Sequence, residues 1–363
     1  MSLLALISGH GFGHWTRSEA VLSRLAERAP VHVRTNLRAR ILQRRADWAT
    51  TRGELNLGPG VAQRGPLQVD VPGTRARWEA HLAAWDHTLA QAAAEARELG
   101  VQAVYADVPP LAFALARELG VPSVACANFT WSWILRPLIA QDPGLEPVVE
   151  RLAAAEAQAT HLVALPGGGG LEACGEPALS TLLARPATRS REEARALLPR
   201  PAGHEELPLA LLSFGGFGNE LDLSAAAARN PGWAFLSFAE PATPPPPNLV
   251  LLPHDHGLSF QDLVLGADAV ISKPGYGIIS ECVAAGQTPL VLCDGTPEFC
   301  EHAVLLDWAP RYLPLGRLSR AQLRGGEWSE ALAAACAASP PEPAPSNGLE
   351  QVVELLAGLL PPR

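Results

Sequence analysis

The segment Ala269-Val-Ile-Ser-Lys-Pro-Gly-Tyr-Gly-Ile-Ile-Ser-Glu-Cys-Val-Ala-Ala-Gly286 decides how the rest of the sequence is interpreted. An apolar run, two glycines and a second apolar run predict a buried strand, a turn and a helix. Gly275 and Gly277 bracket the expected turn, where the backbone needs a positive φ or closely approaches a ligand. Ser280 and Glu281 are expected in the first helical turn, near the positive end of the helix.

Lys273, inside this segment, is the only lysine among the 28 basic residues of the chain. A sequence that uses arginine almost everywhere else and keeps one lysine here indicates that an ammonium group is needed at this turn. The alternative is a structural strand, turn and helix that contains a lysine by chance.

Length and composition restrict the class of protein. A chain of 363 residues is too long for one ordinary core, so two domains are expected. A net charge of -9 argues against a general surface for nucleic acid or anionic membranes. The six cysteines form no Cys-x-x-Cys pair and indicate buried thiols in a reducing compartment.

Targeting signals are not evident in the sequence. The N-terminus resembles a first core strand more than a signal peptide, and no apolar run reaches the ~18 residues that a membrane span needs. We therefore expect a cytoplasmic protein without a membrane span, for which peripheral membrane contact remains open.

Apolar runs alternate with amphipathic segments in both halves of the chain, which predicts an α/β fold of two Rossmann-like, doubly wound parallel sheets. A single helix is expected from about Thr74 to Leu99, and the stretch before it, residues 37–75, is expected to be irregular. The predicted organisation is an N-terminal domain (1–185), a linker (186–207), a C-terminal domain (208–338) and a proline-rich linker with a last helix (339–363).

The first half opens with a strand, Leu3–Ser8, and the loop Gly9-His-Gly-Phe-Gly-His14 before a helix. Such a loop and helix N-terminus favour an anion. A dinucleotide fingerprint would need glycine in place of His14 and an acidic residue after the strand Val31–Thr35, where Asn36 stands instead. A nicotinamide cofactor is therefore not expected.

Ligands bind parallel sheets at the carboxyl ends of the strands. In the first half these ends carry His10, His14 and Asp107, which are residue types used for general-base catalysis. In the second half they carry glycine loops suited to a diphosphate, and Glu281, suited to ribose hydroxyls. The sequence thus predicts a cleft with a nucleotide on the C-terminal side and an acceptor on the N-terminal side.

Five segments in order along the chain resemble one family: Gly9-His-Gly-Phe-Gly-His-Trp-Thr-Arg17, Ala106-Asp-Val-Pro-Pro110, Asn128-Phe-Thr-Trp131, Ser213-Phe-Gly-Gly216 and Lys273-Pro-Gly-Tyr-Gly-Ile-Ile-Ser-Glu281. They are similar to the GT-B glycosyltransferases, most closely to the glycosyltransferase-like N-terminal region of L-arabinokinases and their bacterial relatives. The resemblance to the lipid-II-forming N-acetylglucosaminyltransferases is more distant. No sugar-kinase domain is expected, since the sequence ends at Arg363.

The resemblance implies a role for each matching position. Glu281 would bind the nucleotide ribose, Gly215 and Gly216 would lie by the diphosphate, and Glu298 would meet donor-sugar hydroxyls. Pro297-Glu298 stands where the lipid-II enzymes tend to have paired glutamines, which leaves the donor sugar undefined. The full set of expected donor-binding residues is Gly11, Gly13, Ser213, Gly215, Gly216, His254, Lys273, Gly275, Gly277, Ser280, Glu281 and Glu298, and Asn128 and Trp131 are expected at the acceptor.

The expected reaction is inverting transfer of a sugar from a nucleotide-diphosphate donor, with UDP as the family-level choice, to an acceptor hydroxyl. His14 is the first choice for the base, with Asp107 orienting it, and His10 is the second. Lys273 and helix amides would stabilise the leaving diphosphate. Neither metal nor cofactor is expected. The competing hypotheses are a nucleotide-sugar hydrolase or epimerase on the same fold, and a nucleotide-sugar-binding protein without turnover.

Structural interpretations of these residues stay open as well. His10 and His14 could bond loop carbonyls, Asp107 could cap the next helix, and Asn128–Trp131 could be core packing. His254-Asp255-His256 resembles a metal cluster, but adjacent residues on an extended segment point to opposite faces and no third ligand follows at a set spacing.

Overall fold

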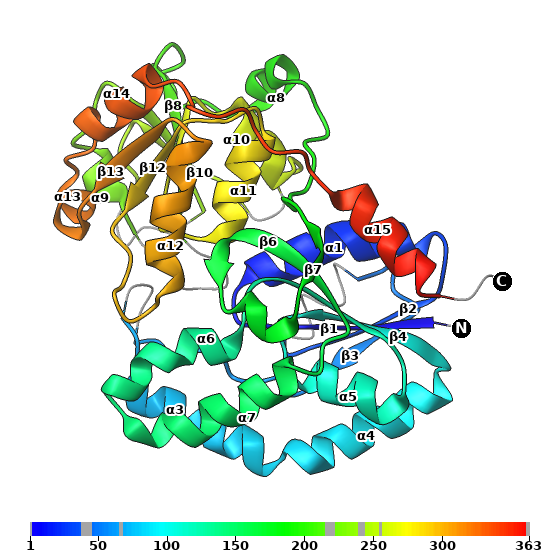
Figure 1. Cartoon of the computed structure of the whole chain (residues 1–363). Helices are drawn as coiled ribbons and strands as arrows, with labels where there is room; N and C mark the ends of the chain where they lie inside the picture. Colours follow the sequence, from blue (N-terminus) through cyan, green and yellow to red (C-terminus); the bar gives the residue numbers. More distant parts are fainter. Residues whose placement is uncertain are drawn as a thin grey trace.

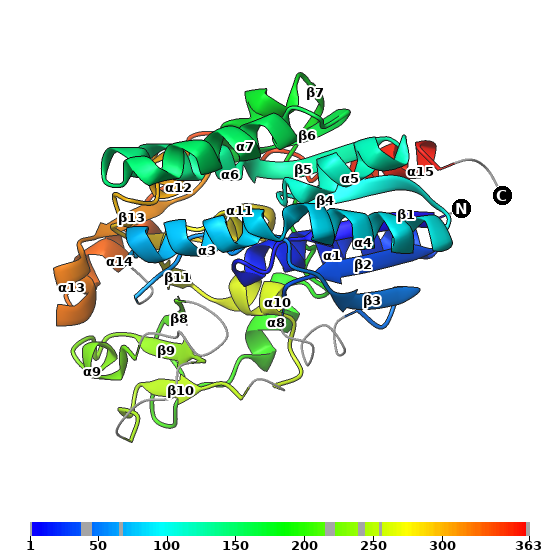
Figure 2. The ribbon, with the colours of Figure 1, turned by 90° about the horizontal axis from the view of Figure 1, so that it is seen from below.

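The computed structural model describes residues 2–37, 46–64, 68–214, 222–238, 244–253 and 256–360, and it contains two parallel β-sheets, each flanked by helices (Figures 1 and 2). The predicted α/β fold with two doubly wound sheets is confirmed. Gly215, Gly216 and His254 lie outside the described residues.

The first sheet has seven strands in the order β3-β2-β1-β4-β5-β6-β7. Leu3, Ala5 and Ile7 of β1 belong to one core cluster, whereas Leu4 and Leu6 belong to another. Successive side chains of a strand point to opposite faces, so helices cover both faces of this sheet. The strands are β1 (Ser2–Ile7), β2 (Val31–Thr35), β3 (Thr51–Glu54), β4 (Val101–Asp107), β5 (Ser123–Phe129), β6 (His161–Gly169) and β7 (Pro177–Ser180).

The second sheet has six strands in the order β10-β9-β8-β11-β12-β13. The strand of the opening segment, β11, lies near its middle between β8 and β12, and each of its four residues is buried. The strands are β8 (Leu209–Ser213), β9 (Ala234–Ser237), β10 (Leu249–Leu251), β11 (Ala269–Ser272), β12 (Leu290–Cys293) and β13 (Leu315–Leu318).

Helices alternate with the strands in both halves. Those that follow strands of the first sheet are α1 (Phe12–Ala26), α3 (Val71–Ala83), α4 (Trp85–Glu98), α5 (Leu111–Leu119), α6 (Trp131–Leu135) and α7 (Glu146–Glu156). Those around the second sheet are α8 (Arg191–Leu197), α9 (Ser224–Ala227), α10 (Phe260–Gly266), α11 (Tyr276–Ala284), α12 (Glu301–Trp308), α13 (Arg320–Gly325) and α14 (Ser329–Ala337). The last helix is α15 (Leu349–Gly358).

The long helix predicted from Thr74 to Leu99 is wrong in detail, because the chain forms α3 and α4 with a break at Ala84. Ala84 has φ -93° and ψ -1°, at the edge of the right-handed helical region, and it ends α3 and precedes α4. The region 37–75 is also less irregular than expected, since it contains β3 and the start of α3. Strands β3, β7 and β13 have no long apolar run, and they form because each pairs with a neighbouring strand.

The chain returns to the first sheet at its end, where α15 packs against α1 (Figure 1). Leu349, Val352, Val353 and Leu356 are buried in the core cluster that also contains Leu22 and Leu25 of α1. Outside this apolar contact, Arg24 pairs with Glu350, and Arg28 Nη1 lies 2.5 Å from Glu354 Oε1. The last helix therefore ties the end of the second half to the first.

Replacing Leu356 by alanine tests this attachment. Leu356 has no exposed surface, so Leu356→Ala is expected to lower the free energy of unfolding by about 2–5 kcal/mol through lost burial and a residual cavity. Equilibrium unfolding in urea measures this change in the free energy of unfolding. Glu354→Ala on the exposed side of the same helix is the control and should change stability by about 0.5 kcal/mol or less. Equal stability of the two variants would contradict the buried contact.

Candidate functional site

The first turns of α1 and α11 meet between the two sheets. A Cβ atom placed on Gly277 of α11 would lie 3.6 Å from the Cα atom of Gly13 in α1. Neither helix has a side chain that caps its N-terminus. The partial positive charge of two helix N-termini therefore gathers in one region, which favours an anion there.

The glycines act differently from what the sequence suggested. Gly11, the residue before α1, has φ 93°, a value that favours glycine. Gly275 has an extended φ of -156°, and Gly277 is not among the described residues with positive φ. The expectation of a positive φ at these two positions is wrong. At Gly277 the backbone of Gly13 comes close, whereas the other expectation, close approach to a ligand, stays a prediction.

Helix α11 begins at Tyr276, so Ser280 and Glu281 lie in its second turn and not in the first as expected. Ser280 Oγ donates to the carbonyl oxygen of Gly277, 2.9 Å away. Glu281 Oε1 accepts hydrogen bonds from Arg185 in the segment between the sheets and from Gln261 of α10. Glu281 thus contacts Arg185 and Gln261 from the second turn of α11 and not from the N-terminal end of this helix.

His14 and Asp107, which are 93 residues apart, lie together at the carboxyl end of the first sheet. His14 Nδ1 is 2.9 Å from Asp107 Oδ1. The same carboxylate accepts bonds from Arg17 Nε and Nη2, each 2.6 Å away, and from Ser18 Oγ at 3.0 Å. Val108 follows with φ 68°, a strained value for a β-branched residue, where the chain turns sharply after Asp107.

The protonation states follow from this geometry. Burial by itself would raise the pKa of Asp107, but Arg17 and His14 outweigh it and lower the pKa to about 2. Burial also lowers the pKa of His14, and the opposing effect of Asp107 is smaller. His14 is therefore neutral near pH 7. His14 Nδ1 lies 2.9 Å from Asp107 Oδ1 and also 2.9 Å from Arg17 Nη2. In the tautomer with hydrogen on Nδ1, this N–H donates to Asp107 and Nε2 is an acceptor, whereas in the other tautomer Nδ1 accepts from Arg17.

Arg17 and Glu301 extend this cluster across the two halves. Arg17 Nη1 donates to Asn128 Oδ1 at 2.8 Å, and Asn128 Nδ2 donates to Glu301 Oε1 of α12 at 2.7 Å. The guanidinium also lies 5.0 Å from the ring centroid of Tyr276. Sequence reasoning did not single out Arg17 or Glu301. The available signal for Arg17 was its spacing of three residues from His14, which places both on one helix face.

Lys273 directly follows β11 and is partly buried. Among the described residues, no carboxylate oxygen lies within ion-pair distance of its ammonium group. Burial lowers the pKa of Lys273, and Cys293 and Glu301 oppose that shift. Its positive charge in turn contributes to the lowered pKa of His10, behind burial and His14. Lys273 thus acts on His10 through its charge and has no ion-pair partner among the residues that the structure describes.

His10 lies among aromatic side chains. Its ring centroid is 5.2 Å from that of Trp131 and 6.4 Å from that of Phe299, which comes from the loop before α12. Burial, His14 and Lys273 together lower the pKa of His10 to about 3. The ring of His10 is therefore neutral and packs against aromatic side chains. His14, by contrast, lies beside the charged groups of Asp107 and Arg17.

The other predicted residues have varied environments. The carbonyl oxygen of Ser213 accepts from Ser272 Oγ at 2.6 Å, and Glu298 Oε2 accepts from Thr296 Oγ1 at 2.6 Å. Both amide atoms of Asn128 are engaged, and Trp131 is 1% exposed. A role for Asn128 and Trp131 in acceptor binding stays a prediction.

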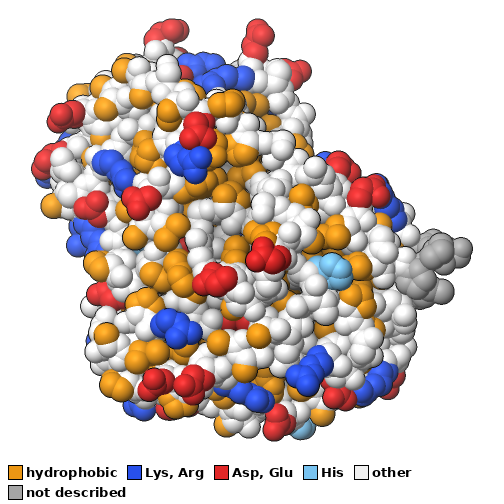
Figure 3. Space-filling model, viewed as in Figure 1, with side chains coloured by type: hydrophobic (Ala, Val, Ile, Leu, Met, Phe, Trp, Pro, Cys, Tyr) orange, Lys and Arg blue, Asp and Glu red, His pale blue; other side chains and the backbone are white. Residues whose placement is uncertain are grey.

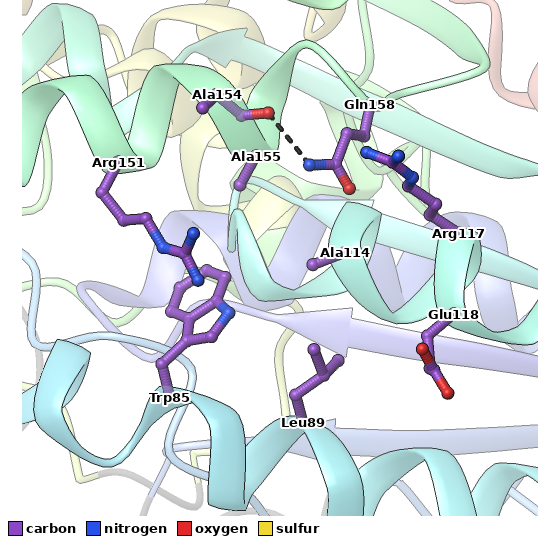
Figure 4. A pocket seen from close by; sticks show the side chains of 9 residues that line it. All are labelled: Trp85, Leu89, Ala114, Arg117, Glu118, Arg151, Ala154, Ala155 and Gln158. Carbon is purple, nitrogen blue, oxygen red and sulfur yellow. Dashed lines mark hydrogen bonds between the residues drawn. The ribbon is translucent and has the colours of Figure 1, made fainter.

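A separate groove of about 340 Å³ lies between α4, α5 and α7, where Arg151 stacks on Trp85 with 5.6 Å from the guanidinium carbon to the ring centroid (Figure 4). None of the predicted site residues lines it.

On the face shown in Figure 3, acidic and basic side chains are interspersed. In the described part of the chain, no helix is long and apolar enough to cross a membrane, and no group of three or more His, Cys, Asp or Glu side chains could hold a metal ion.

Solved structures with the same arrangement are glycosyltransferases. The chain superposes on the kitacinnamycin glycotransferase with a TM-score of 0.62 at 15% identity, covering 99% of both chains. It also matches Phytolacca americana UGT2 complexed with UDP-2-fluoro-glucose and pterostilbene (TM-score 0.59, 13% identity, 99% of both chains) and VinC in complex with dTDP (TM-score 0.57, 17% identity, 99% of both chains).

The chain has the GT-B fold. Among curated proteins, it is 26% identical to L-arabinokinase from Arabidopsis thaliana over 362 residues, which cover 96% of this chain and 33% of that protein. The chain thus spans about one third of the length of this relative. No family model matches the sequence. In this GT-B structure, the convergence of α1 and α11 lies between the two sheets, where the predicted donor and acceptor halves meet.

Removing Arg17 tests the buried cluster. Arg17→Met leaves the Asp107 carboxylate buried without its cation, so the free energy of unfolding is expected to fall by about 3–5 kcal/mol. Chemical denaturation followed by circular dichroism measures the change. Arg28→Met removes an arginine from an exposed pair with Glu354 and should leave the unfolding midpoint nearly unchanged. A similarly small effect of Arg17→Met would show that the cluster does not need its cation.

Proposed function

We propose that this protein is a glycosyltransferase that moves a sugar from a nucleotide-diphosphate donor to an acceptor hydroxyl with inversion at the anomeric carbon and without a metal ion. The observation that carries the proposal is the 2.9 Å contact between His14 Nδ1 and Asp107 Oδ1. It places an oriented, neutral imidazole beside the region where two helix N-termini and Lys273 favour an anion.

The base is the first element of the mechanism. With Nδ1–H donated to Asp107, Nε2 of His14 accepts the proton of the acceptor hydroxyl while that oxygen attacks the anomeric carbon. The bond from this carbon to the diphosphate oxygen breaks, and the nucleoside diphosphate leaves with the electron pair. His10 is the weaker choice because its ring lies in an apolar contact with Trp131, and in the part of the chain that the structure describes no carboxylate orients it.

Stabilisation of the leaving group is the second element. Negative charge develops on the diphosphate as the bond breaks, so fixed positive groups near it lower the barrier. The N-termini of α1 and α11, near Gly13 and Gly277, and the ammonium group of Lys273 are those groups here. Glu281 would accept a ribose hydroxyl and Glu298 would bind the donor sugar.

UDP and dTDP are the first nucleotides to test, because the solved structures that share this fold include one complexed with UDP-2-fluoro-glucose and one in complex with dTDP. A panel of UDP- and dTDP-sugars, with and without candidate acceptors, separates the possible reactions. Acceptor-dependent release of nucleotide supports transfer, whereas free sugar formed without acceptor indicates a hydrolase. If no nucleotide of the panel binds, the proposed donor site is wrong.

Replacing the base gives the sharpest test of the residue assignment. His14→Asn is expected to lower kcat by about 10²–10⁴, because general-base catalysis typically contributes that much. The dissociation constant of the nucleotide, measured by calorimetry, should change little. His10→Asn is the comparison variant on the same loop. If His14→Asn retained wild-type turnover, the assignment of His14 would be wrong.

The pH dependence of turnover follows from burial of this histidine. The base must be neutral, and burial lowers the pKa of His14 below its usual value of 6.5. Lowering the pH from 8 to 6.5 is therefore expected to leave kcat/KM nearly constant, and the acidic limb of the profile should lie below pH 6.5. A limb centred above pH 6.5 would contradict the proposed protonation state.

A further inference from the structure

The side chain of Asn128, near the end of β5, joins the two halves of the structure with both ends of its amide. Oδ1 accepts from Arg17 Nη1 of the first half at 2.8 Å, and Nδ2 donates to Glu301 Oε1 of the second half at 2.7 Å. Because a guanidinium group only donates, Arg17 fixes Oδ1 on its own side and leaves Nδ2 facing Glu301. Asn128 has no exposed surface, so losing either bond would leave a buried polar group unsatisfied.

Glycines at the end of β6 hold both sides of the bond between Asn128 and Glu301. A Cβ atom on Gly168 would lie 1.4 Å from the carbonyl oxygen of Asn128, and one on Gly167 would lie 2.8 Å from Cδ2 of Leu305 in α12. Any larger residue would displace these neighbours, so the close approach requires glycine. The backbone of Asn128 and the helix that begins at Glu301 therefore both rest on β6.

Arg17 continues this connection to the proposed base. Its Nε and Nη2 donate to Asp107, each at 2.6 Å, and its Nη2 also lies 2.9 Å from His14 Nδ1. The contacts form one chain of five buried side chains: His14, Asp107, Arg17, Asn128 and Glu301. Hydrogen bonds to charged groups are stronger than those between neutral groups. A displacement of Glu301 is therefore passed on to the imidazole of His14.

We propose that Asn128 is a positioning residue of the transferase: its amide keeps the base of the first half in a fixed position relative to the second half, without touching either substrate. This inference rests on the proposed function, in which His14 is the base. It is an alternative to acceptor binding by Asn128, because a residue that binds the acceptor needs a polar group free to meet it, and both ends of this amide have charged partners.

Reversing the polarity of the bond tests the proposal. Asn128→Asp still accepts from Arg17 but places a carboxylate oxygen opposite Glu301, so kcat is expected to fall by about tenfold to a hundredfold, as for a lost hydrogen bond to a charged group. In the Glu301→Gln background, the new carboxylate accepts from the new amide at position 301. Adding Asn128→Asp there should lower kcat less than about threefold. The assay uses the UDP- or dTDP-sugar and the acceptor with the highest turnover in the panel.

The Michaelis constant separates positioning from binding. The KM of the acceptor and the Kd of the nucleotide should stay within about threefold of wild type in Asn128→Asp, since Asn128 touches neither substrate. A tenfold rise in the KM of the acceptor at unchanged kcat would overturn the proposal, because Asn128 would then bind the acceptor. A lowered unfolding midpoint with unchanged kcat and KM would overturn it as well, because the role of Asn128 would then be structural.

Asn128→Ala is the matched control. Alanine can bond neither Arg17 nor the residue at position 301, so this variant should lower kcat by a similar factor in both backgrounds. If Asn128→Asp alone fails to fold, the comparison is made within the Glu301→Gln background, where Asn128→Asp should turn over about tenfold faster than Asn128→Ala. Equal kcat values of these two variants would overturn the proposal, because the restored bond would then have no effect.

Hydrogen exchange of the unliganded protein, followed by mass spectrometry, makes the test independent of the substrates. Asn128→Asp should speed exchange of the backbone amides of α1 and α12 by about threefold or more, and adding Glu301→Gln should restore the wild-type rates. Helices α4 and α14 are the internal references, because they carry none of the five side chains. Unchanged exchange in α1 would overturn the inference.

Failure of the proposed function looks different from failure of this inference. If no nucleotide of the panel binds, the proposed function is wrong, and hydrogen exchange still decides whether Asn128 connects α1 to α12. If turnover is found but the Glu301→Gln background does not rescue Asn128→Asp, only the inference about Asn128 is overturned.

Discussion

The ion pair between Arg17 and Asp107 is the interaction on which the site depends. Asp107 ends the central strand β4 and has no exposed surface, so its charge requires a cation and several donors in place of water. Arg17 supplies two N–H groups to it from α1. Because this pair fixes the rotation of α1 over the sheet, His14, one turn earlier on the same helix face, is brought to the same carboxylate. The orientation of the base is thus a consequence of how the charge of Asp107 is compensated.

The same arginine connects the site to the arrangement of the two halves. Its third hydrogen bond reaches Asn128, which is bonded to Glu301 of α12, and its guanidinium lies over the ring of Tyr276 in α11. Contacts of Gly13 with Gly277 and of α1 with α15 lie along the same helix. One helix of the first half therefore carries several of the contacts described between the halves. A displacement of the two sheets would disturb the base and the anion-favouring region together.

Glu281 links the proposed nucleotide site to the segment that connects the two sheets, because it is bonded to Arg185 of that segment. Its partner Arg185 lies in the segment between the two sheets, and that segment is bonded on either side to α10 and α11. The nucleotide-binding carboxylate proposed here is thus tied to the connection between the halves. The groove beside Trp85, by contrast, shares no residue with these groups.

Local sequence patterns were sufficient for the alternation of strands and helices in both halves and for the parallel sheets, but not for the short strands β3, β7 and β13. These features depend on apolar periodicity and on glycine at turns, which are properties of neighbouring residues. His14 and Asp107 could be named for the same reason, since each stands at the end of an apolar strand or in the glycine loop after one. Their contact required the strand order β2-β1-β4, in which β1 pairs with the distant β4 as well as with β2.

Tertiary structure alone decided which charges are compensated and by which partner. Arg17 meets Asp107 over 90 residues, Arg185 meets Glu281 over 96, and Asn128 meets Glu301 over 173. No local pattern encodes such pairs, because they depend on which strand ends become neighbours. The opening segment shows both sides: its sequence determined a strand, a turn and a helix, whereas the packing of α11 against α1 and α10 decided that Gly277 serves a close helix contact and that Glu281 lies in the second turn beside Arg185.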